Sequence, residues 1–392
     1  MVKDVSGKKN NIVIWPSSFY PVSGGVQTVA KEIGEFLHNN EWNVTFVTNR
    51  FPRKLDKKEQ INDQQIHRFT FLHSPLTYYR SNRFDLFFAW VFYKPITLIR
   101  LISLFSKVRP NIVHVHFPDN QVLEALLLKI IFDFKLVVSF HGNDIEKLNS
   151  ISIKSLKSIL LRILLKQADL ITGCSNYITN KVLDTYPDIN KEKITTLYNG
   201  VGKDFENLSL QKKKDDFFFT AARNVPVKGI DMVLPLIKIF RHHKIKVAGK
   251  GFKNNDQESK IIILGNIDSY EIKTNLLHCA ICIVPSRSEA FGIIIAEALC
   301  CGSPIITTNV GGIPEVIKLA KSNLTDEEIL IFNDWVKLVE PNVESLTQGI
   351  NDILKNLSPI KDYIDIIPKI QKQFTWGKRL EIYQNFLSTF IL

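Results

Sequence analysis

The sequence predicts an α/β protein with two doubly wound domains, each built on a parallel sheet. Short runs rich in β-branched residues alternate with helical stretches over nearly the whole chain, which is the pattern of parallel strands joined by crossover helices. One polar stretch with a run of charges, LSLQKKKDD, interrupts this alternation at 208–216 and predicts a linker. A length of 392 residues fits two or three domains, and a hydrophobic content of 45% supplies their cores.

The expected strands form two series, one on each side of the linker. In the first half we expect strands at 11–15, 43–48, 66–71, 111–117, 136–142 and 170–175. In the second half we expect them at 217–223, 244–251, 261–266, 281–286 and 304–310. Val26–Asn39 is expected to be the first helix, because its apolar residues recur at helical spacing. The domains are therefore expected to span 1–207 and 217–372, with a ligand-binding cleft between the carboxyl ends of their sheets.

The chain is basic, and the excess charge lies in its first half. The net charge is +11, to which residues 1–200 contribute +9 (26 Lys+Arg against 17 Asp+Glu) and residues 201–392 contribute +2 (24 against 22). Such a half indicates an anionic partner: nucleic acid, a membrane surface or a phosphorylated substrate. Five cysteines and a start without an apolar segment are typical of a cytoplasmic protein with reduced thiols. No uncharged apolar run reaches ~18 residues, so we expect no membrane-spanning helix.

Glycine turns follow several of the predicted strands. Gly24 and Gly25 lie between the first strand and the first helix, where backbone N–H groups can approach an anion, although a plain tight turn explains the pair equally well. The dinucleotide fingerprint G-x-G-x-x-G is absent here, which argues against a dehydrogenase. Turns that allow close backbone approach also follow two strands of the second half, at Gly249, Gly251, Gly265 and Asn266.

Charged residues follow two strands of the second half. Arg223 and Lys228 flank a turn that leads toward a helix, and two cations beside a helix N-terminus can hold a diphosphate; solvated surface charges are the alternative interpretation. Glu289 lies in a turn, and Glu297 lies eight residues later in an otherwise apolar helix. Both carboxylates can accept hydrogen bonds from ligand hydroxyls. For Glu297 a structural salt bridge remains the alternative, because a buried carboxylate needs a partner.

In this order the motifs resemble those of a large family of retaining glycosyltransferases of GT-B fold, the glycosyltransferase family 4 or group 1 type. The resemblance covers nearly the whole chain, and the stretch 285–315 is its most specific part. It is carried by Gly24-Gly25, His141-Gly142, Asn199-Gly200-Val201, Arg223 with Lys228-Gly229, Gly249 with Gly251, Glu289 with Glu297, Gly302 with Pro304, and Gly311-Gly312 with Pro314-Glu315. The ending is similar to the family's last helix, so residues 373–392 are expected to cross back and pack on the first domain.

The resemblance implies transfer of a sugar, with retention at the anomeric carbon, from a UDP- or GDP-sugar to a glycan or lipid-linked acceptor in cell-surface polysaccharide or glycolipid synthesis. By similarity, the catalytic residues are His141, Arg223, Lys228 and Glu289. By similarity, the donor is bound by Gly24, Gly25, Gly249, Gly251, Gly265, Asn266, Ala290, Phe291, Gly292 and Glu297. Arg223 and Lys228 would neutralise the diphosphate, and Glu297 would accept from the ribose hydroxyls. Glu289 would hold hydroxyls of the donor sugar, and His141 would lie beside that sugar.

We expect no metal and no cofactor. Fixed cations and helix N-termini can stabilise a departing diphosphate in place of a metal, and the sequence contains no Asp-x-Asp triplet to hold one. Cys279 and Cys282 with His278 look like half a zinc site, but the next pair, Cys300-Cys301, has the wrong spacing. Thiols packed in the core are the preferred interpretation.

Five residues stay open at this stage. His114 and His116 alternate on one strand face and could line a pocket or pack at a strand end. Ser175 lacks a G-x-S-x-G elbow, which argues against a hydrolase. Tyr198 stands where the family often has Pro, and Gly202 stands where it often has Asp.

Two segments, 67–110 and 154–166, mix cations with apolar residues. Seven cations and one acidic residue, Asp85, lie in the first, among six aromatics: Phe84, Phe87, Phe88, Trp90, Phe92 and Tyr93. The second has an apolar side at Leu156, Ile159, Leu160 and Ile163. This mixture fits an anionic membrane surface and a peripheral location; a half-buried helix with a solvated basic face is the alternative. No nucleic-acid module is recognised, so no nucleic-acid partner is expected.

Two function classes remain. The first is a sugar-transferring enzyme at a membrane surface, and the second is a non-catalytic, basic membrane- or polymer-binding protein on the same fold. The intact set of Arg223, Lys228, Glu289 and Glu297 favours the enzyme.

Overall fold

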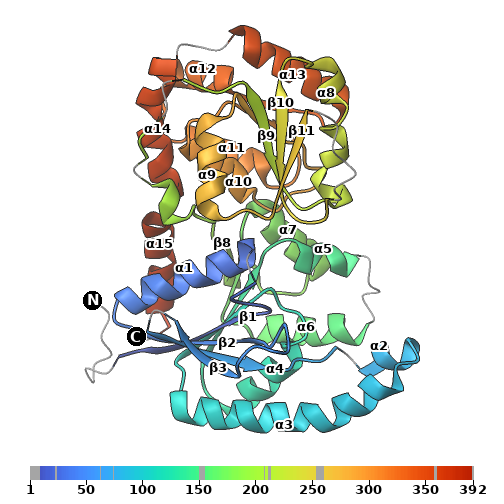
Figure 1. Cartoon of the computed structure of the whole chain (residues 1–392). Helices are drawn as coiled ribbons and strands as arrows, with labels where there is room; N and C mark the ends of the chain where they lie inside the picture. The colour runs from blue at the N-terminus through green and yellow to red at the C-terminus, as the bar shows by residue number, and fades with distance from the viewer. Residues whose placement is uncertain are drawn as a thin grey trace. The chain divides into compact units, whose positions relative to one another are not determined.

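The computed structural model describes residues 9–22, 24–61, 63–73, 75–149, 155–206, 208–210, 213–252, 260–356 and 360–390. The chain divides into two compact units, Met1–Leu197 with Leu380–Leu392 and Tyr198–Arg379. The described residues of the expected linker, 208–210 and 213–216, fall within the second unit. Each unit carries one sheet flanked by helices (Figure 1), which is the predicted doubly wound architecture.

The first unit has an eight-stranded sheet in the order β3-β4-β2-β1-β5-β6-β7-β8. Its strands are β1 Asn11–Pro16, β2 Asn43–Asn49, β3 Lys58–Ile61, β4 Gln64–Phe69, β5 Ile112–His116, β6 Lys135–Phe140, β7 Leu170–Gly173 and β8 Ile194–Thr196. All neighbours are parallel except β3 and β4. The six predicted strands are present, and β3 and β8 are additional short strands at the two edges.

Helices cover both faces of this sheet. They are α1 Gly25–Asn39, α2 Pro75–Arg80, α3 Phe84–Val108, α4 Val122–Ile131, α5 Asn143–Asn149, α6 Leu156–Gln167, α7 Asn176–Thr185 and, from Leu380 on, α15 Trp376–Ser388. The ring of Phe46 and the end of Ile14 approach the backbone of Gly34 in α1. On the opposite face Trp15 meets Phe105 of α3, with ring centroids 6.2 Å apart. The two faces therefore pack against α1 and α3 respectively (Figure 1).

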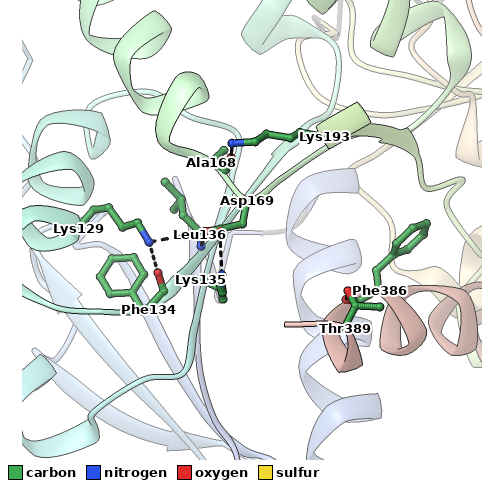
Figure 2. A network of polar contacts seen from close by, with 9 residues as sticks. All are labelled: Lys129, Phe134, Lys135, Leu136, Ala168, Asp169, Lys193, Phe386 and Thr389. Carbon is green, nitrogen blue, oxygen red and sulfur yellow. Dashed lines mark hydrogen bonds and ion pairs between the residues drawn. The ribbon is translucent and has the colours of Figure 1, made fainter. Parts of the chain in front are cut away.

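A polar network joins the amino ends of β6 and β7 (Figure 2). Asp169 accepts a hydrogen bond from the backbone of Leu136 at 2.8 Å and pairs with Lys135 at 3.2 Å. Lys193 donates to the carbonyl of Ala168 at 3.0 Å. These groups lie at the amino ends of the strands, where they stabilise the connections. They are therefore away from the carboxyl ends, where such a sheet binds ligands.

The second unit has a six-stranded parallel sheet in the order β11-β10-β9-β12-β13-β14. Its strands are β9 Phe217–Ala221, β10 Lys244–Ala248, β11 Ile261–Gly265, β12 Ile281–Val284, β13 Ile305–Thr308 and β14 Val336–Val339. Counted from β9, this is the order 3-2-1-4-5-6 of dinucleotide-binding folds, whose connections diverge between β9 and β12. Ligands of such sheets bind outside the carboxyl ends at that divergence. The edge strand β14 was missed by the sequence analysis.

The helices of this unit are α8 Leu236–Ile239, α9 Ser269–His278, α10 Ile293–Cys300, α11 Ile313–Lys321, α12 Asp326–Trp335, α13 Val343–Asn356 and α14 Ile360–Phe374. Side chains of α8 and α13 pack on β9, β10, β12 and β13 in one apolar cluster. Trp335 stacks on Tyr363 of α14 at 4.2 Å. The helix expected from Gly229 onward is a pair of 3₁₀ turns, Pro226–Lys228 and Ile230–Met232, because Gly229 has a φ of 64° that ends the first turn.

Among the described residues, one helix is long and apolar enough to cross a membrane by length and composition, namely α3. Only 11% of its most apolar stretch is buried. The sequence analysis passed over it because charged residues such as Lys94 and Arg100 interrupt its apolar run.

Candidate functional site

Four loops of the second unit are joined by backbone hydrogen bonds at the carboxyl ends of the strands. The amide of Arg287 donates to the carbonyl of Val227 at 2.8 Å, which links the β12 loop to the β9 loop. The amide of Gly312 donates to the carbonyl of Glu289 at 2.9 Å and adds the β13 loop. The amide of Asn224 donates to the carbonyl of Lys250 at 2.8 Å and adds the β10 loop. The sequence-predicted residues of this unit therefore lie on one connected surface at the divergence of the sheet.

Two glycines allow this close approach. Gly229 has a φ of 64°, and a Cβ there would lie 1.9 Å from the carbonyl oxygen of Pro285. Gly311 has a φ of 58°, and a Cβ there would lie 2.1 Å from the carbonyl oxygen of Glu289. No side chain fits at either distance, so the loops keep their spacing only with glycine at both positions.

Lys228 and Glu289 form an ion pair through Nζ and Oε2. The hydroxyl of Ser286 lies 3.4 Å from the same carboxylate oxygen. An ammonium group has three N–H donors, so Lys228 can meet Glu289 and still donate to an anionic ligand. Arg223, at the start of the same loop, is exposed and has no partner in the described part of the chain. Lys228 and Glu289 are thus in contact, and among the described residues nothing neutralises the charge of Arg223.

Glu297 lies in α10 and is half-buried. Within the described ranges no cation or hydrogen-bond donor pairs with its carboxyl group, so the salt-bridge interpretation is wrong for this part of the chain. Burial raises the pKa of Glu297 to about 8. A carboxyl group in this state is ready to accept hydrogen bonds that a bound ligand supplies.

The start of α10 supplies backbone donors. Gly292 precedes the helix with a φ of 91°, and no side chain caps the helix there. The first amide groups of a helix have no partner within it, so they can bind a ligand oxygen. Phe291 is buried at 2% exposure and anchors this turn in the core. Ala290 lies between Glu289 and Phe291 and belongs to the segment 290–292 that was predicted to bind the donor.

The other predicted glycine turns lie beside one another. The amide of Gly249 donates to the carbonyl of Gly265 at 2.7 Å, which joins the ends of β10 and β11; Asn266 comes next. A Cβ at Gly249 would lie 1.9 Å from the carbonyl oxygen of Ala222. The side chain of Asn224 donates to the carbonyl of Gly251 at 3.1 Å. The β10 turn therefore lies directly against the loop that carries Arg223.

Three residues near Phe291 had no role predicted from the sequence: Tyr198, Glu315 and Arg379. The hydroxyl of Tyr198 donates to Glu315 at 3.0 Å, and its ring lies 6.2 Å from the ring of Phe291. The guanidinium of Arg379 lies 5.7 Å from the centre of the Tyr198 ring. Tyr198 was noted only as a departure from the family pattern, and this contact to Glu315, 117 residues away, has no local sequence signal.

His141, Gly24 and Gly25 belong to the first unit. The carboxylate of Asp144 accepts from the amides of His141 at 2.9 Å and Gly142 at 2.8 Å, which fixes the turn between β6 and α5. Burial lowers the pKa of His141 to about 4, so its ring is neutral at pH 7. Gly24 precedes α1, where a Cβ would lie 2.8 Å from Oε1 of Gln27. The sequence-predicted set is therefore divided between the two units.

The cysteines, Ser175, His114 and His116 are all buried within the fold. The five cysteines are free and buried, as predicted for core thiols. No group of three or more His, Cys, Asp or Glu suited to a metal is found within the part of the chain that the structure describes. Ser175 is buried and accepts from the amide of Ile178 at 3.3 Å, which caps α7. His114 and His116 are buried in β5, so they pack within the fold.

Solved glycosyltransferases share this fold. Sucrose-phosphate synthase from Thermosynechococcus elongatus matches with a TM-score of 0.70 and 17% identity, over 97% of this chain and 100% of its own. HepE from Anabaena, in complex with UDP-glucose, matches with a TM-score of 0.66 and 14% identity, over 96% of this chain and 99% of its own. The two units form a GT-B fold, and the protein is a glycosyltransferase.

The chain belongs to the group 1 glycosyltransferases. The model of Glycosyltransferase Family 4 matches residues 23–205, and that of Glycosyl transferases group 1 matches residues 203–369. N-acetyl-alpha-D-glucosaminyl L-malate synthase of Bacillus anthracis is 26% identical over 325 residues, 76% of this chain and 79% of its own. The GPI3 subunit of phosphatidylinositol N-acetylglucosaminyltransferase of Saccharomyces cerevisiae is 24% identical over 408 residues, 97% of this chain and 84% of its own. The predicted family, fold and enzyme class are confirmed.

Proposed function

We propose that the protein transfers a sugar from a UDP- or GDP-sugar to a glycan or lipid-linked acceptor, with retention at the anomeric carbon and without a metal. The observation that carries the proposal is the second unit's combination of the Lys228–Glu289 ion pair with the carboxyl group of Glu297, which has no partner among the described residues. The donor class is supported by HepE, whose matching structure holds UDP-glucose. The names of both relatives contain an N-acetylglucosaminyl group.

Departure of the diphosphate is the step that the second unit assists. Negative charge grows on the diphosphate oxygens as the sugar bond breaks, and cations already in place stabilise it without reorganising. Lys228 is held in position by Glu289, and the exposed guanidinium of Arg223 offers a planar set of donors for phosphate oxygens. These two cations take the role that a metal has elsewhere, which is the basis for proposing metal independence.

The remaining groups orient the donor. Glu297 accepts hydrogen bonds from the ribose hydroxyls, which compensates the cost of its burial. The amides at the start of α10 and the carboxylate of Glu289 hold hydroxyls of the donor sugar. His141 contacts the donor sugar as a neutral ring, because burial keeps its pKa near 4. Retention means that the new bond forms on the face from which the diphosphate leaves.

A thermal-shift screen with UDP-, GDP- and ADP-sugars tests the donor assignment. A ligand that binds only the native state stabilises it by about 2.7 kcal/mol at a concentration of 100 Kd. We expect one UDP- or GDP-sugar to raise the melting temperature of the wild type, and to raise it less in a Glu297→Gln variant. Glu344→Gln, an exposed change in α13, is the matched control. The same melting temperature with every nucleotide sugar would contradict the proposal.

We also propose that the first unit docks on an anionic membrane, where it meets a lipid-linked acceptor and works as a peripheral protein in surface glycan or glycolipid synthesis. The support is an apolar outer face on α3. Its side chains are 45–69% exposed at Phe84, Phe88, Val91, Phe92, Tyr93, Ile96 and Ile99. A lone exposed apolar residue is ordinary, but seven on one helix form a surface that favours an interface.

The helix α6 has a similar face. Its apolar side, predicted either to meet a membrane surface or to belong to a half-buried helix, is 42–45% exposed at Leu156, Ile159 and Ile163. Arg162 and Lys166 lie on the same side, and each pairs with Asp188. Exposed cations among apolar side chains suit a surface that carries anionic headgroups.

Two cations expected on this surface are instead held in ion pairs, Arg68 buried and Lys94 half-buried. Arg68 is 1% exposed and contacts Glu59 at 2.5 Å. Lys94 of α3 contacts Glu124 of α4 at 2.5 Å. Their role is structural, because the Lys94 pair holds α3 against the unit while its outer face stays open. The exposed cations Arg100, Lys107 and Arg109 remain for the membrane.

Co-sedimentation with vesicles tests the docking. We expect pelleting with phosphatidylcholine vesicles that contain phosphatidylglycerol, and weaker pelleting as salt rises from 0.1 M to 1 M, because the screening length falls from ~10 Å to ~3 Å. Phe88→Ser with Phe92→Ser should reduce pelleting, whereas Leu330→Ser, an exposed change in α12, should leave it unchanged. Equal pelleting with neutral vesicles, or none at low salt, would remove the membrane from the proposal.

A further inference from the structure

Three histidines of the first unit form a buried cluster behind the turn that carries His141. Nδ1 of His116 lies 3.1 Å from Nε2 of His141, and the two rings are stacked within 25°. The ring of His114 lies 3.8 Å from that of His116. Tyr383 of α15 and Ser139 of β6 each contact one ring nitrogen of His114 at 2.6 Å. The cluster thus connects strands β5 and β6 with the last helix.

The positions of the protons in this cluster follow from burial. All three rings are neutral, because burial lowers the pKa of His141 to about 4 and those of His114 and His116 well below the usual value. Each ring therefore carries one N–H and one acceptor nitrogen. Nε2 of His116 is buried and has no hydrogen-bond partner in the described part of the chain. A proton on that nitrogen would be a buried donor without an acceptor, which is the more costly arrangement.

The proton of His116 is consequently on Nδ1, where Nε2 of His141 accepts it. His141 must then carry its own proton on Nδ1. Among the residues that the structure describes, that nitrogen has no partner, and the side chain is half-buried, so it reaches the surface of the unit.

We propose that His116 is a positioning residue that holds the imidazole of His141 in the Nδ1–H form, so that His141 presents a hydrogen-bond donor to the donor sugar. The inference rests on the role proposed above for His141. This role explains why two histidines are buried here, where apolar side chains would pack without the cost of desolvating polar groups.

The neighbours of His116 keep its ring in place. His114 stacks against it, and both nitrogens of His114 are occupied by Tyr383 and Ser139. Ser139 in turn contacts the hydroxyl of Thr172 in β7 at 2.5 Å. Because both ring nitrogens of His114 are hydrogen-bonded, His114 is fixed in place. It therefore limits rotation of the adjacent His116 ring away from His141.

The tautomers are measured directly by long-range ¹H–¹⁵N correlation spectra of protein labelled with ¹⁵N-histidine, with His141 assigned from a His141→Asn sample. We expect the wild type to show His141 protonated on Nδ1. In His116→Asp, whose carboxylate oxygen takes the place of Nδ1 but accepts a hydrogen bond instead of donating one, His141 should move to the Nε2–H form. In His116→Asn, whose amide nitrogen takes the place of Nδ1, the wild-type form should persist.

Kinetics supply a second readout, with nucleoside diphosphate release from the sugar nucleotide found in the thermal-shift screen. We expect kcat to fall about tenfold in His116→Asp with KM little changed, and to be largely retained in His116→Asn. An Nε2–H form of His141 in the wild type, or an Nδ1–H form that persists in His116→Asp, would overturn the inference. Because the spectra need no activity, an Nδ1–H wild type without nucleotide-sugar turnover would count against the proposed function alone.

Discussion

Replacing Glu297 with glutamine tests whether the carboxyl group of Glu297, which has no partner among the described residues, is protonated in the native state. Burial raises the pKa of Glu297 from 4.5 to about 8. A carboxyl group whose pKa is raised by folding holds its proton more tightly in the native than in the unfolded state. Its contribution to stability is therefore lost as the pH rises from 4.5 to 8. Glutamine has the shape of the protonated acid and does not titrate, so E297Q escapes this loss.

The size of the effect follows from the shift. A pKa that moves from 4.5 to about 8 changes the free energy of unfolding by about 4 kcal/mol between pH 5 and pH 9. We expect wild type and E297Q to differ least near pH 5, and E297Q to be the more stable by about 4 kcal/mol at pH 9. Urea unfolding across this range measures the difference, and the titration of all other groups cancels in it.

The control is E344Q, which removes an exposed carboxylate from α13 and should follow the wild-type curve. Parallel curves for wild type and E297Q would refute the reasoning, because Glu297 would then be ionised in the native state and stabilised by a partner. The experiment needs no ligand, so it examines the site independently of the donor.

Three other changes probe the same surface. Gly229→Ala should lower turnover at least a hundredfold with the far-UV spectrum retained, because its Cβ would lie 1.9 Å from the carbonyl oxygen of Pro285 and force the loops apart; Gly377→Ala, where nothing lies within 4 Å, is the control and should keep full activity. Lys228→Ala should lower turnover about tenfold or more, since it removes a diphosphate cation and leaves Glu289 unpaired; unchanged turnover in a folded variant would show that the ion pair is only structural. Turnover should be unaffected by EDTA, and activity lost with EDTA and restored by Mn²⁺ would show that a metal is required.

The central strands could be predicted from the sequence because strands buried on both faces appear as continuous apolar runs. Ile12–Trp15 in β1 and Ile281–Val284 in β12 are of this kind. The edge strands β3, β8 and β14 are short and half-exposed, so their residues resemble those of loops. Several predicted strands were too long, as at 217–223, because the residues after a strand end can be extended without pairing.

The helix α6 shows what periodicity leaves undecided. Its sequence has apolar residues on two sides, and the side with Leu156, Ile159 and Ile163 was expected either to meet a membrane surface or to be half-buried. The fold buries Leu161 and Leu164 instead. Periodicity identifies an amphipathic helix, but the neighbouring elements decide which apolar side faces them.

The residue types of the site were determined by the sequence alone, because glycine turns and charges after strands are local features of the chain. The pairing of Lys228 with Glu289 was not, since these residues are 61 positions apart and were expected to meet different parts of the donor. Only the tertiary structure brings them together, through the close backbone approach of Gly229 to Pro285. It also decides that Glu297 has no partner within the described ranges, whereas the buried Arg68 and the half-buried Lys94 are held in ion pairs. The physical reason is that a charge's partner and its exposure depend on which distant segments pack beside it, and local sequence carries no record of those contacts.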